Sequence, residues 1–191
     1  MTRLAIVLSA VGSPFVLLPV TVLLVSLRTA SPARAVAFAG ALACLGVVPL
    51  ALVIRRRVRA GRWSDHDVSN PSHRRGFYPV AIGVSAGTAL AMWLLGAPGI
   101  VVRGVLVTIV LLALGLTLVR WSKISLHASI SAFCAVTLAA VSMWVAGGAL
   151  LFATAVGWSR IWLGRHTLWQ VLSGAALGAA GGCIVLRPPF F

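Results

Sequence analysis

The chain has very few acidic side chains. Only two of its 191 residues are Asp or Glu, whereas sixteen are Lys or Arg, and the formal net charge is +14. Charged residues of both signs make up 9% of the sequence, compared with about 25% in soluble globular domains. This composition excludes an ordinary soluble domain. Both acidic residues, Asp65 and Asp67, fall in one short stretch, SDHDVSNPSHRR at residues 64–75, beside two histidines and two arginines.

Cysteine is scarce as well, and its placement excludes a disulfide framework or a cysteine metal site. The three cysteines, Cys44, Cys134 and Cys183, all lie inside apolar runs. A free cysteine in such a run behaves as a small buried hydrophobic residue. We therefore expect the fold to depend on neither a disulfide nor a bound metal.

Apolar residues are what the chain has in abundance. They make up 60% of it, and the mean hydropathy is +1.05. We therefore expect an integral membrane protein that forms one domain over residues 1–191. In such a protein the positive charge favours anionic membrane lipids, or a phosphate-bearing lipid substrate, over nucleic acid. The first apolar run, Leu4–Leu27, exceeds the roughly 7–15 residues of a signal-peptide core, so we interpret it as a spanning helix.

The apolar runs predict an all-α bundle of about six to seven transmembrane helices, since about 20 apolar residues cross the hydrocarbon core. The expected spans are Leu4–Leu27, Ala35–Ile54, Phe77–Leu95, Ile100–Val119, Ile124–Val145, Ala146–Trp162 and Leu168–Val185. Short turns with Pro or Gly separate them at Arg28–Arg34, Gly96–Gly99 and Gly147-Gly148. The sixth span is short, because Gly147 to Ser159 does not cross a membrane at 1.5 Å per residue.

Glycine recurs at four-residue spacing in the last span, at Gly174, Gly178 and Gly182. Small residues at this spacing let two helices approach closely. The stripe therefore predicts close helix packing, and it is also the surface through which a homo-oligomer would form. The first two spans occupy residues 1–54, and the core helices with the polar motifs occupy residues 64–170.

Three polar segments that are far apart in the sequence are expected on one side of the membrane. Residues 55–76 follow the second span, and the chain returns to the same side at residues 120–123 and again at residues 158–160. Arginines crowd this side, at Arg55, Arg56, Arg57, Arg59 and Arg62, whereas Arg28 and Arg34 lie on the other. The positive-inside rule makes the polar face cytoplasmic. We therefore expect a multi-pass protein of the cell membrane with a site on its cytoplasmic face.

The three segments carry residues that resemble a known motif set. The first supplies Asp67-Val-Ser-Asn-Pro-Ser-His73-Arg74, the second Lys123-Ile-Ser125-Leu-His127, and the third Ser159-Arg160-x4-Arg165-His166-x3-Gln170. In order and placement they resemble the type-2 phosphatidic acid phosphatase family of membrane lipid phosphatases. That family has the motifs Lys-x6-Arg-Pro, Pro-Ser-Gly-His and Ser-Arg-x5-His-x3-Asp. The resemblance covers residues 67–170, and the third motif is its most specific part.

The resemblance implies roles for individual residues. His166 matches the histidine that attacks phosphorus and forms a phospho-enzyme, and His127 matches the histidine that protonates the leaving alkoxide. The positions that match or adjoin the family's phosphate-binding residues are Arg160, Arg74, Ser125, Lys123, Arg75 and Ser159. Phosphoryl transfer needs positioning and positive charge around three equatorial oxygens, which Arg forks and a Lys supply. Two histidines provide nucleophile and proton donor without a metal or cofactor.

The sequence departs from the family at several positions. Asp67 stands where the family has Lys, Arg75 where it has Pro, and Ile124-Ser125-Leu126-His127 where it has Pro-Ser-Gly-His. Gln170 replaces the Asp that holds the nucleophilic histidine in its useful tautomer. An equivalent carboxylate-to-amide change costs about 10⁴ in rate in the serine-protease triad. Either the activity is reduced or another carboxylate takes over, and the chain offers only Asp65 and Asp67.

Other interpretations remain open for these residues. Asp65 and Asp67 could orient a histidine, organise the arginines, cap the next helix or pair with Arg74 and Arg75. His66 and His73 fit solvated loop positions. Three other functions compete with a polyprenyl phosphate or diphosphate phosphatase. The first is a phosphatase of phosphatidic acid or another glycerolipid phosphate. The second is a Mg²⁺-dependent prenyl or CDP-alcohol transferase, which would need more Asp ligands than two. The third is a catalytically inactive lipid-binding protein.

Overall fold

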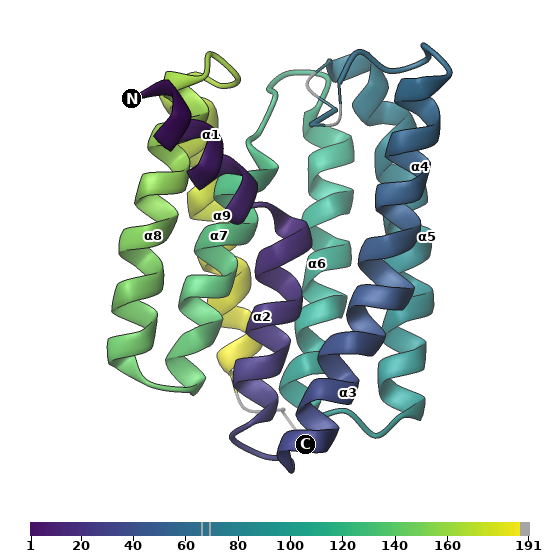
Figure 1. The fold of residues 1–191 in the computed structure, drawn as a ribbon, viewed down its shortest axis with the longest axis vertical. Helices are drawn as coiled ribbons and strands as arrows, with labels where there is room; N and C mark the ends of the chain where they lie inside the picture. The colour runs from purple at the N-terminus through teal and green to yellow at the C-terminus, as the bar shows by residue number, and fades with distance from the viewer. Residues whose placement is uncertain (66, 69, 188–191) are drawn as a thin grey trace.

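The computed structural model describes residues 1–65, 67–68 and 70–187, and all the regular secondary structure in this part of the chain is helical (Figure 1). The prediction of an all-α fold is confirmed. His66 lies outside the described residues. The helices, in order, are α1 Thr2–Val11, α2 Pro14–Ser26, α3 Pro32–Leu42, the π-helical turn η1 Ala43–Val47, α4 Val48–Arg59, α5 Pro71–Leu94, α6 Gly99–Leu118, α7 Leu126–Thr137, the 3₁₀ turn η2 Leu138–Ala140, α8 Met143–Trp162 and α9 Leu168–Leu186.

In the described part of the chain, four helical segments are long and apolar enough to cross a membrane. They are Pro32–Arg59, Pro71–Leu94, Gly99–Leu118 and Leu168–Leu186, and the bent pair α1–α2 would make a fifth. The sequence predicted six to seven spans. The difference lies in α7, which is a shorter apolar helix, and in α8, which is not among these segments although its 20 residues extend about 30 Å. The structure therefore supports a helical membrane protein with at least four candidate spans.

The first expected span is not one helix. It is divided at Gly12 and Ser13 into α1 and α2, which meet at a bend of 50°. Pro14 has no N–H group and disfavours a helical conformation at the residue before it. Ser13 instead caps α2 by accepting a hydrogen bond from the Phe15 N–H. α1 then leans against α8, so closely that a Cβ on Gly12 would overlap Val156.

The boundary between the fifth and sixth expected spans was also wrong. The chain turns at Val141 and Ser142, where the Ser142 hydroxyl caps α8, and Gly147 and Gly148 lie inside that helix. A serine N-cap stabilises a helix start by about 1 kcal/mol, whereas a glycine inside a helix costs about 1 kcal/mol. The cap therefore sets the boundary, and α8 is longer than the sequence suggested.

The glycine stripe of α9 packs inside the molecule against α7. A Cβ on Gly178 would overlap the Ser129 carbonyl oxygen, and Gly174 and Gly182 lie equally close to α7. Most of α7 is buried in consequence. The three glycines face α7 within one chain, and a homo-oligomer through this helix stays a prediction. The close packing brings the first turns of α7 and α9 together.

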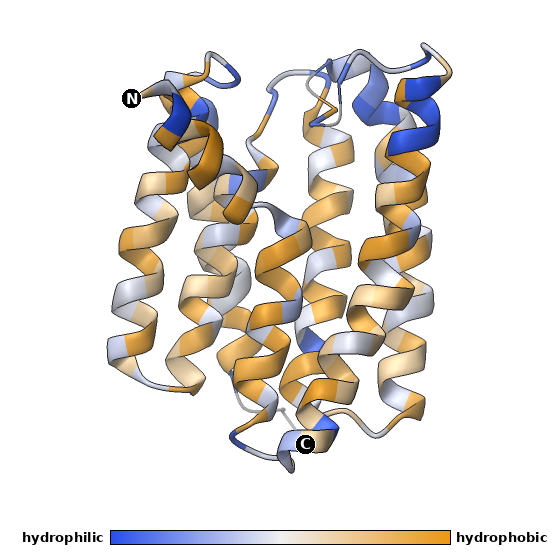
Figure 2. Ribbon diagram, in the orientation of Figure 1, coloured by the Kyte–Doolittle hydropathy of each residue, from blue (hydrophilic) through white to orange (hydrophobic). Residues whose placement is uncertain are grey.

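The polar segments gather at one end of the bundle. In Figure 2 the hydrophilic residues concentrate at the upper end, where α4 ends and where the loops before α5, α7 and α9 lie. The start of α1 lies at the same end (Figure 1). Since the chain enters α5, α7 and α9 from this end, residues of three distant loops come within contact distance of one another.

We predict the orientation of the bundle from its arginines. A cysteine placed at Ala60, beside the arginine cluster of α4, should not react with a membrane-impermeant thiol reagent in intact cells, whereas a cysteine at Thr29, in the turn at the opposite end, should react. Both positions are exposed, and the positive-inside rule assigns the arginine-rich end to the cytoplasm. The measurement is thiol labelling in a background without the native cysteines, with lysed cells as the control. The reverse labelling pattern would place the polar end outside.

Candidate active site

Arg74 lies buried in the first turns of α5, where it connects two loops. Asn70 caps the helix by accepting a hydrogen bond from the Ser72 N–H at 3.0 Å, and Pro71 is its first residue. Only 2% of Arg74 is exposed. Its Nε donates to the Val68 carbonyl oxygen at 3.0 Å and its Nη1 to the Ile124 carbonyl oxygen at 2.6 Å. Arg74 thereby brings a buried positive charge into the cluster and fixes both neighbouring loops.

Arg160, near the end of α8, is the most enclosed charged residue of the site. It is 1% exposed, and its Nη1 donates to Ser9 Oγ at 2.6 Å and to Asp67 Oδ2 at 2.9 Å. Its Nε is buried and, among the described residues, has no hydrogen-bond partner. A buried donor without a partner is unfavourable. The described residues therefore leave one N–H of the Arg160 guanidinium unused.

Ser9 was not found by the sequence analysis. It lies in α1, inside the apolar run that was interpreted as a plain spanning helix, and it is 8% exposed. The bend between α1 and α2 brings it to Arg160. Ser9 is one of three serines within the run Leu4–Leu27, and that pattern does not indicate which of them contacts a distant residue.

Asp67 pairs with Arg160 and not with Arg74 or Arg75, the partners that its neighbourhood in the sequence suggested. Burial by itself would raise the pKa of the Asp67 carboxyl, but the charges of Arg160 and His127 and the hydrogen bond from Arg160 outweigh it and hold the pKa below its usual range. The carboxylate is therefore ionised at neutral pH. Of the roles open to Asp67, the geometry shows it organising an arginine.

The loop that carries Asp67 is held in an uncommon conformation. Val68 has a φ of 49°, which is rare for a β-branched residue and is strained. The Val68 side chain is buried, and its carbonyl oxygen accepts the hydrogen bond from Arg74. Contacts on both sides of the residue thus fix the position from which Asp67 reaches Arg160.

His166 lies in the tight loop between α8 and α9, and Gln170 orients its ring. His166 Nδ1 is 3.0 Å from Gln170 Oε1, which also accepts the Thr167 N–H at 3.3 Å. The Thr167 N–H can only donate, so the Gln170 atom is the amide oxygen. Nδ1 must then carry the hydrogen, and the lone pair lies on Nε2. Gln170 thus selects the tautomer that the family's Asp selects.

The ring of His166 is neutral over most of the pH range. Burial first, and then the charge of Arg74, lowers its pKa to about 4, although the hydrogen bond with Gln170 acts in the opposite direction. His166 is 7% exposed. A neutral imidazole with a free Nε2 lone pair has the electronic form that a nucleophile needs.

His127 and Ser125 begin α7 beside the other groups. Ser125 caps α7 by accepting from the Ala128 N–H at 3.4 Å, and its own N–H donates to the Gln170 carbonyl oxygen at 3.1 Å. Ser125 is fully buried, so its hydroxyl acts as a helix cap, and its contact with Gln170 joins the starts of α7 and α9. His127 is near enough to Asp67, Arg160 and His166 for their charges to interact.

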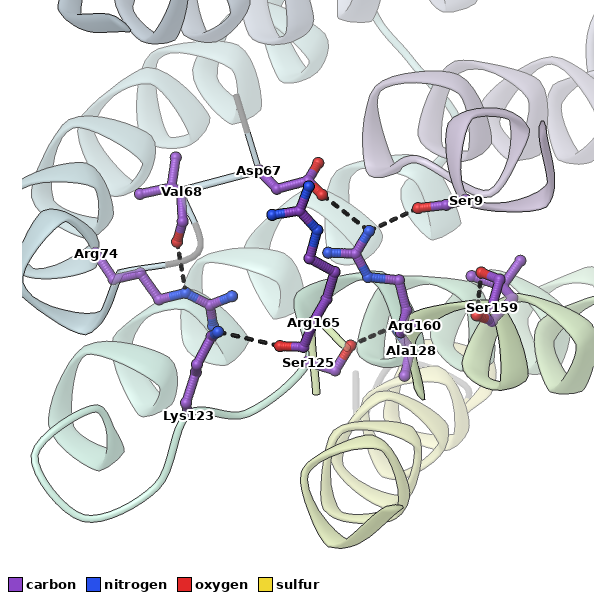
Figure 3. Close-up of polar contacts among 11 residues, drawn as sticks. Ser9, Asp67, Val68, Arg74, Lys123, Ser125, Ala128, Ser159, Arg160 and Arg165 are labelled. Atoms are coloured by element: carbon purple, nitrogen blue, oxygen red, sulfur yellow. Dashed lines mark hydrogen bonds and ion pairs between the residues drawn. The ribbon is translucent and has the colours of Figure 1, made fainter. Parts of the chain in front are cut away.

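Lys123 and Arg165 complete a cluster of positive charge. Lys123 Nζ donates to the Arg165 carbonyl oxygen at 3.1 Å, which joins the loops before α7 and α9. Burial, followed by the charge of Arg74, lowers the pKa of Lys123. Figure 3 shows the side chains of Arg74, Arg165 and Arg160 converging near Asp67. With two acidic residues in the whole chain, the four cations cannot all be neutralised, and the cluster attracts anions.

Two of the expected phosphate-binding residues are not in the cluster. Ser159 is fully buried, and its hydroxyl donates to the Val156 carbonyl oxygen at 2.7 Å, within its own helix. In Figure 3 it lies apart from the arginines. Arg75 is exposed, because it follows Arg74 by one residue and projects about 100° around the helix from it. His73 lies in the first turn of α5 and not in the loop that the sequence suggested, and it also stays outside the cluster, where it accepts the Ser64 N–H and stacks on Trp63.

The cluster lies at the polar end of a large cavity. The cavity has a volume of about 630 Å³. Its polar lining residues at this end are Asp67, Arg74, His127, Arg160 and Arg165. His166 is not among the described residues that line it. An anion that enters from the cavity therefore meets His127 and three arginines first.

Comparison of the chain with protein-family models, curated proteins and solved structures found no match. Among the described residues, no group of three or more His, Cys, Asp or Glu side chains is placed to hold a metal ion.

We predict that the contact between Asp67 and Arg160 stabilises the fold. Asp67→Asn should lower the free energy of unfolding by about 1–3 kcal/mol, since it weakens a hydrogen bond to a buried charge. The effect should fall toward the lower value because the Asp67 side chain is 33% exposed. Arg75→Gln, at an exposed position in the same region, is the control and should change stability by about 0.5 kcal/mol or less. Equal unfolding curves for both variants in detergent would contradict the structural role of Asp67.

Proposed function

We propose that this protein is a membrane phosphatase that hydrolyses a lipid phosphate monoester or diphosphate through a phosphohistidine intermediate. It would be a divergent relative of the type-2 phosphatidic acid phosphatases, acting on the cytoplasmic face of the cell membrane. The observation that carries the proposal is the cluster itself. Four cations and two histidines, from three distant segments, lie together at the polar end of an apolar cavity. A polyprenyl phosphate or diphosphate is the favoured substrate.

The cluster fits the electrostatics of phosphoryl transfer. The transferred group carries negative charge on three equatorial oxygens, and fixed donors stabilise it most where water is excluded. Arg160 has a buried Nε without a partner, and Arg74 and Arg165 approach the same space. Guanidinium groups bind phosphate through paired hydrogen bonds. These arginines would hold the phosphate while Lys123 adds charge and fixes the Arg165 backbone.

The two histidines would divide the reaction into two displacements. His166 Nε2 attacks phosphorus in line, the bond from phosphorus to the leaving oxygen breaks, and His127 gives that oxygen its proton. His127 must therefore begin this step in its protonated form. Burial lowers the pKa of His127 in the protein alone, whereas the negative charge of a bound phosphate would raise it. The lipid alcohol, or a lipid monophosphate when the substrate is a diphosphate, then leaves. In the second step His127 removes a proton from water, the resulting oxygen attacks phosphorus, and the phosphorus–nitrogen bond breaks. Inorganic phosphate is released, and both histidines return to their starting forms.

A catalytically inactive lipid-binding protein is the second candidate, and one observation favours it. The Asp67 carboxylate occupies Nη1 of Arg160, an N–H that a bound phosphate would otherwise use. An acidic group at this point repels phosphate, and the family's Lys at the matching position would attract it. Under this second reading the cluster would bind a lipid phosphate without turning it over.

The main test is phosphate release from a panel of lipid phosphates by the purified protein. The panel should include polyprenyl phosphates, polyprenyl diphosphates and phosphatidic acid, each with and without EDTA. We expect release that EDTA does not inhibit, and an acid-labile phospho-enzyme that disappears in His166→Ala, because His166 is the ring whose Nδ1 is held by Gln170 and whose Nε2 lone pair is left free. EDTA inhibition would favour the magnesium-dependent transferase instead. Binding without any release would favour the inactive candidate.

His127→Ala separates the roles of the two histidines. It should still form the phospho-enzyme from a substrate with a good leaving group, such as an aryl phosphate, because the leaving oxygen then needs no proton. It should turn over natural lipid phosphates poorly. If His127→Ala abolishes the phospho-enzyme and His166→Ala retains it, then His127 is the nucleophile and His166 the proton donor. The position of His127 in the cavity wall would explain that result.

The pH dependence should report on the contact between His166 and Gln170. Because His166 must be neutral to attack and its pKa is lowered to about 4, phospho-enzyme formation should fall only as the pH drops toward that value. Gln170→Glu places a carboxylate beside the ring, which favours the imidazolium and raises the pKa of His166 by roughly 1–3. The acid limb of the pH–rate profile should therefore shift to higher pH by the same amount. An acid limb that the Glu variant leaves in place would mean that another group controls it.

A further inference from the structure

The cavity extends far beyond the charged cluster. It follows one face of α2, where Pro14, Leu18, Val22 and Val25 line it. Eleven residue steps separate the first from the last, which correspond to about 17 Å along the helix. One leaflet of a membrane, half of a hydrocarbon core of roughly 30 Å, has nearly the same depth. The cavity therefore runs from the polar end into the bundle for about the length of a lipid tail.

The deeper wall of this cavity is mainly apolar, and three of its hydroxyl groups are bonded to the backbone. Thr88, Thr108 and Thr137 all line it, and each hydroxyl donates to a backbone carbonyl of its own helix, at 2.8, 2.9 and 2.8 Å. A hydroxyl bonded in this way leaves its methyl group to face the space. The remaining wall is largely aliphatic and aromatic, as at Leu112 and Phe133. Such a surface suits a hydrocarbon chain and does not suit water or a second polar group.

The polar end provides the matching charge. Arg74, Arg160 and Arg165 line the cavity there, so the two ends of the cavity have the chemistry of the two ends of a lipid phosphate. A hydrophobic peptide or a neutral lipid would fill the apolar part but leave three arginines facing a group without negative charge. Charge complementarity therefore selects an anionic amphiphile as the occupant.

We propose that the cavity is the tail site of the substrate and that it admits one hydrocarbon chain, which selects single-chain lipid phosphates over diacyl ones. This inference rests on the proposed function for the identity of the head group. At roughly 30 Å³ for each methylene, near the share of liquid volume of a water molecule, 630 Å³ holds at most one chain of about 20 carbons, because part of this volume lies at the polar end. Two hexadecyl chains would need about 1000 Å³ by the same measure. The distal part of a longer polyprenyl chain would extend into the bilayer.

Gly104 gives a direct test, because it lines the cavity with free space in front of it. The nearest atom to a Cβ at this position is a carbon of the Phe133 ring at 3.8 Å. Gly104→Leu would place a branched side chain in the path of the tail. Gly148→Leu is the matched control, since Gly148 is also inside a helix, is exposed, and has no atom within 4 Å of a Cβ.

The experiment measures binding of non-hydrolysable alkyl phosphonates to the full-length protein in nanodiscs of one lipid composition. We expect hexadecyl phosphonate to bind Gly104→Leu on the order of tenfold more weakly than wild type. The leucine side chain would prevent the tail from entering the deeper cavity while the phosphonate contacts the arginines. Octyl phosphonate should bind both proteins equally, which also shows that the variant is folded. Gly148→Leu should match wild type for both compounds. Unchanged hexadecyl binding to Gly104→Leu would place the tail outside the cavity and overturn the proposal.

The number of chains is tested with the diacyl analogue that carries two hexadecanoyl chains. We expect wild type to bind it more weakly than hexadecyl phosphonate. If it binds equally well and Gly104→Leu weakens it equally, the cavity takes two chains and the single-chain inference is wrong. If the expected binding pattern holds but no lipid phosphate is hydrolysed, the tail site stands and the proposed phosphatase activity fails.

Discussion

The buried guanidinium of Arg160 is the group on which the arrangement of the polar end depends. A charge removed from water must find partners inside the protein, and Arg160 finds them in two elements other than its own helix. Ser9 reaches it from α1 and Asp67 from the loop before α5. Removing α1 or moving that loop would leave the charge unpaired. The need to satisfy one side chain therefore fixes the position of the N-terminal helix, the acidic loop and the end of α8 together.

The second constraint is the close contact between α7 and α9. Glycines on α9 let the two backbones approach, so that the N–H of Ser125 reaches the carbonyl of Gln170. Gln170 then has three functions at once. Its backbone carbonyl oxygen accepts the hydrogen bond from Ser125 at the start of α7. Its side chain completes the capping box of α9 with Thr167, and the side-chain amide oxygen also orients His166. An Asp at this position has a shorter side chain and is less suited to a capping box, in which Glu or Gln bonds back to the start of the helix.

The sequence predicted the coarse features because they depend on local patterns. Apolar length predicted helices, and the order of the spans placed residues 67, 127 and 166 at the same end. Features set by contacts between distant segments were missed. Pro14 and Ser13 were visible as a proline and a potential cap, but the apolar run around them indicated an uninterrupted span. Ser159 matched a motif, yet only the structure shows its hydroxyl bonded within α8. The partner of Asp67 lies 93 residues away, and no local pattern indicates it.

Three helices, α5, α7 and α9, begin at the charged cluster (Figure 1). The peptide dipoles of a helix sum to roughly half a positive charge at its N-terminus. Close to these three helix starts, part of the positive potential therefore belongs to the backbone, which neither titrates nor depends on any one side chain. The ends of α4, α6 and α8 lie on the same side and carry the opposite partial charge, so the backbone contribution is local to the starts of α5, α7 and α9. At those three points it keeps its sign at every pH at which the helices remain folded, and it would survive the loss of a single arginine.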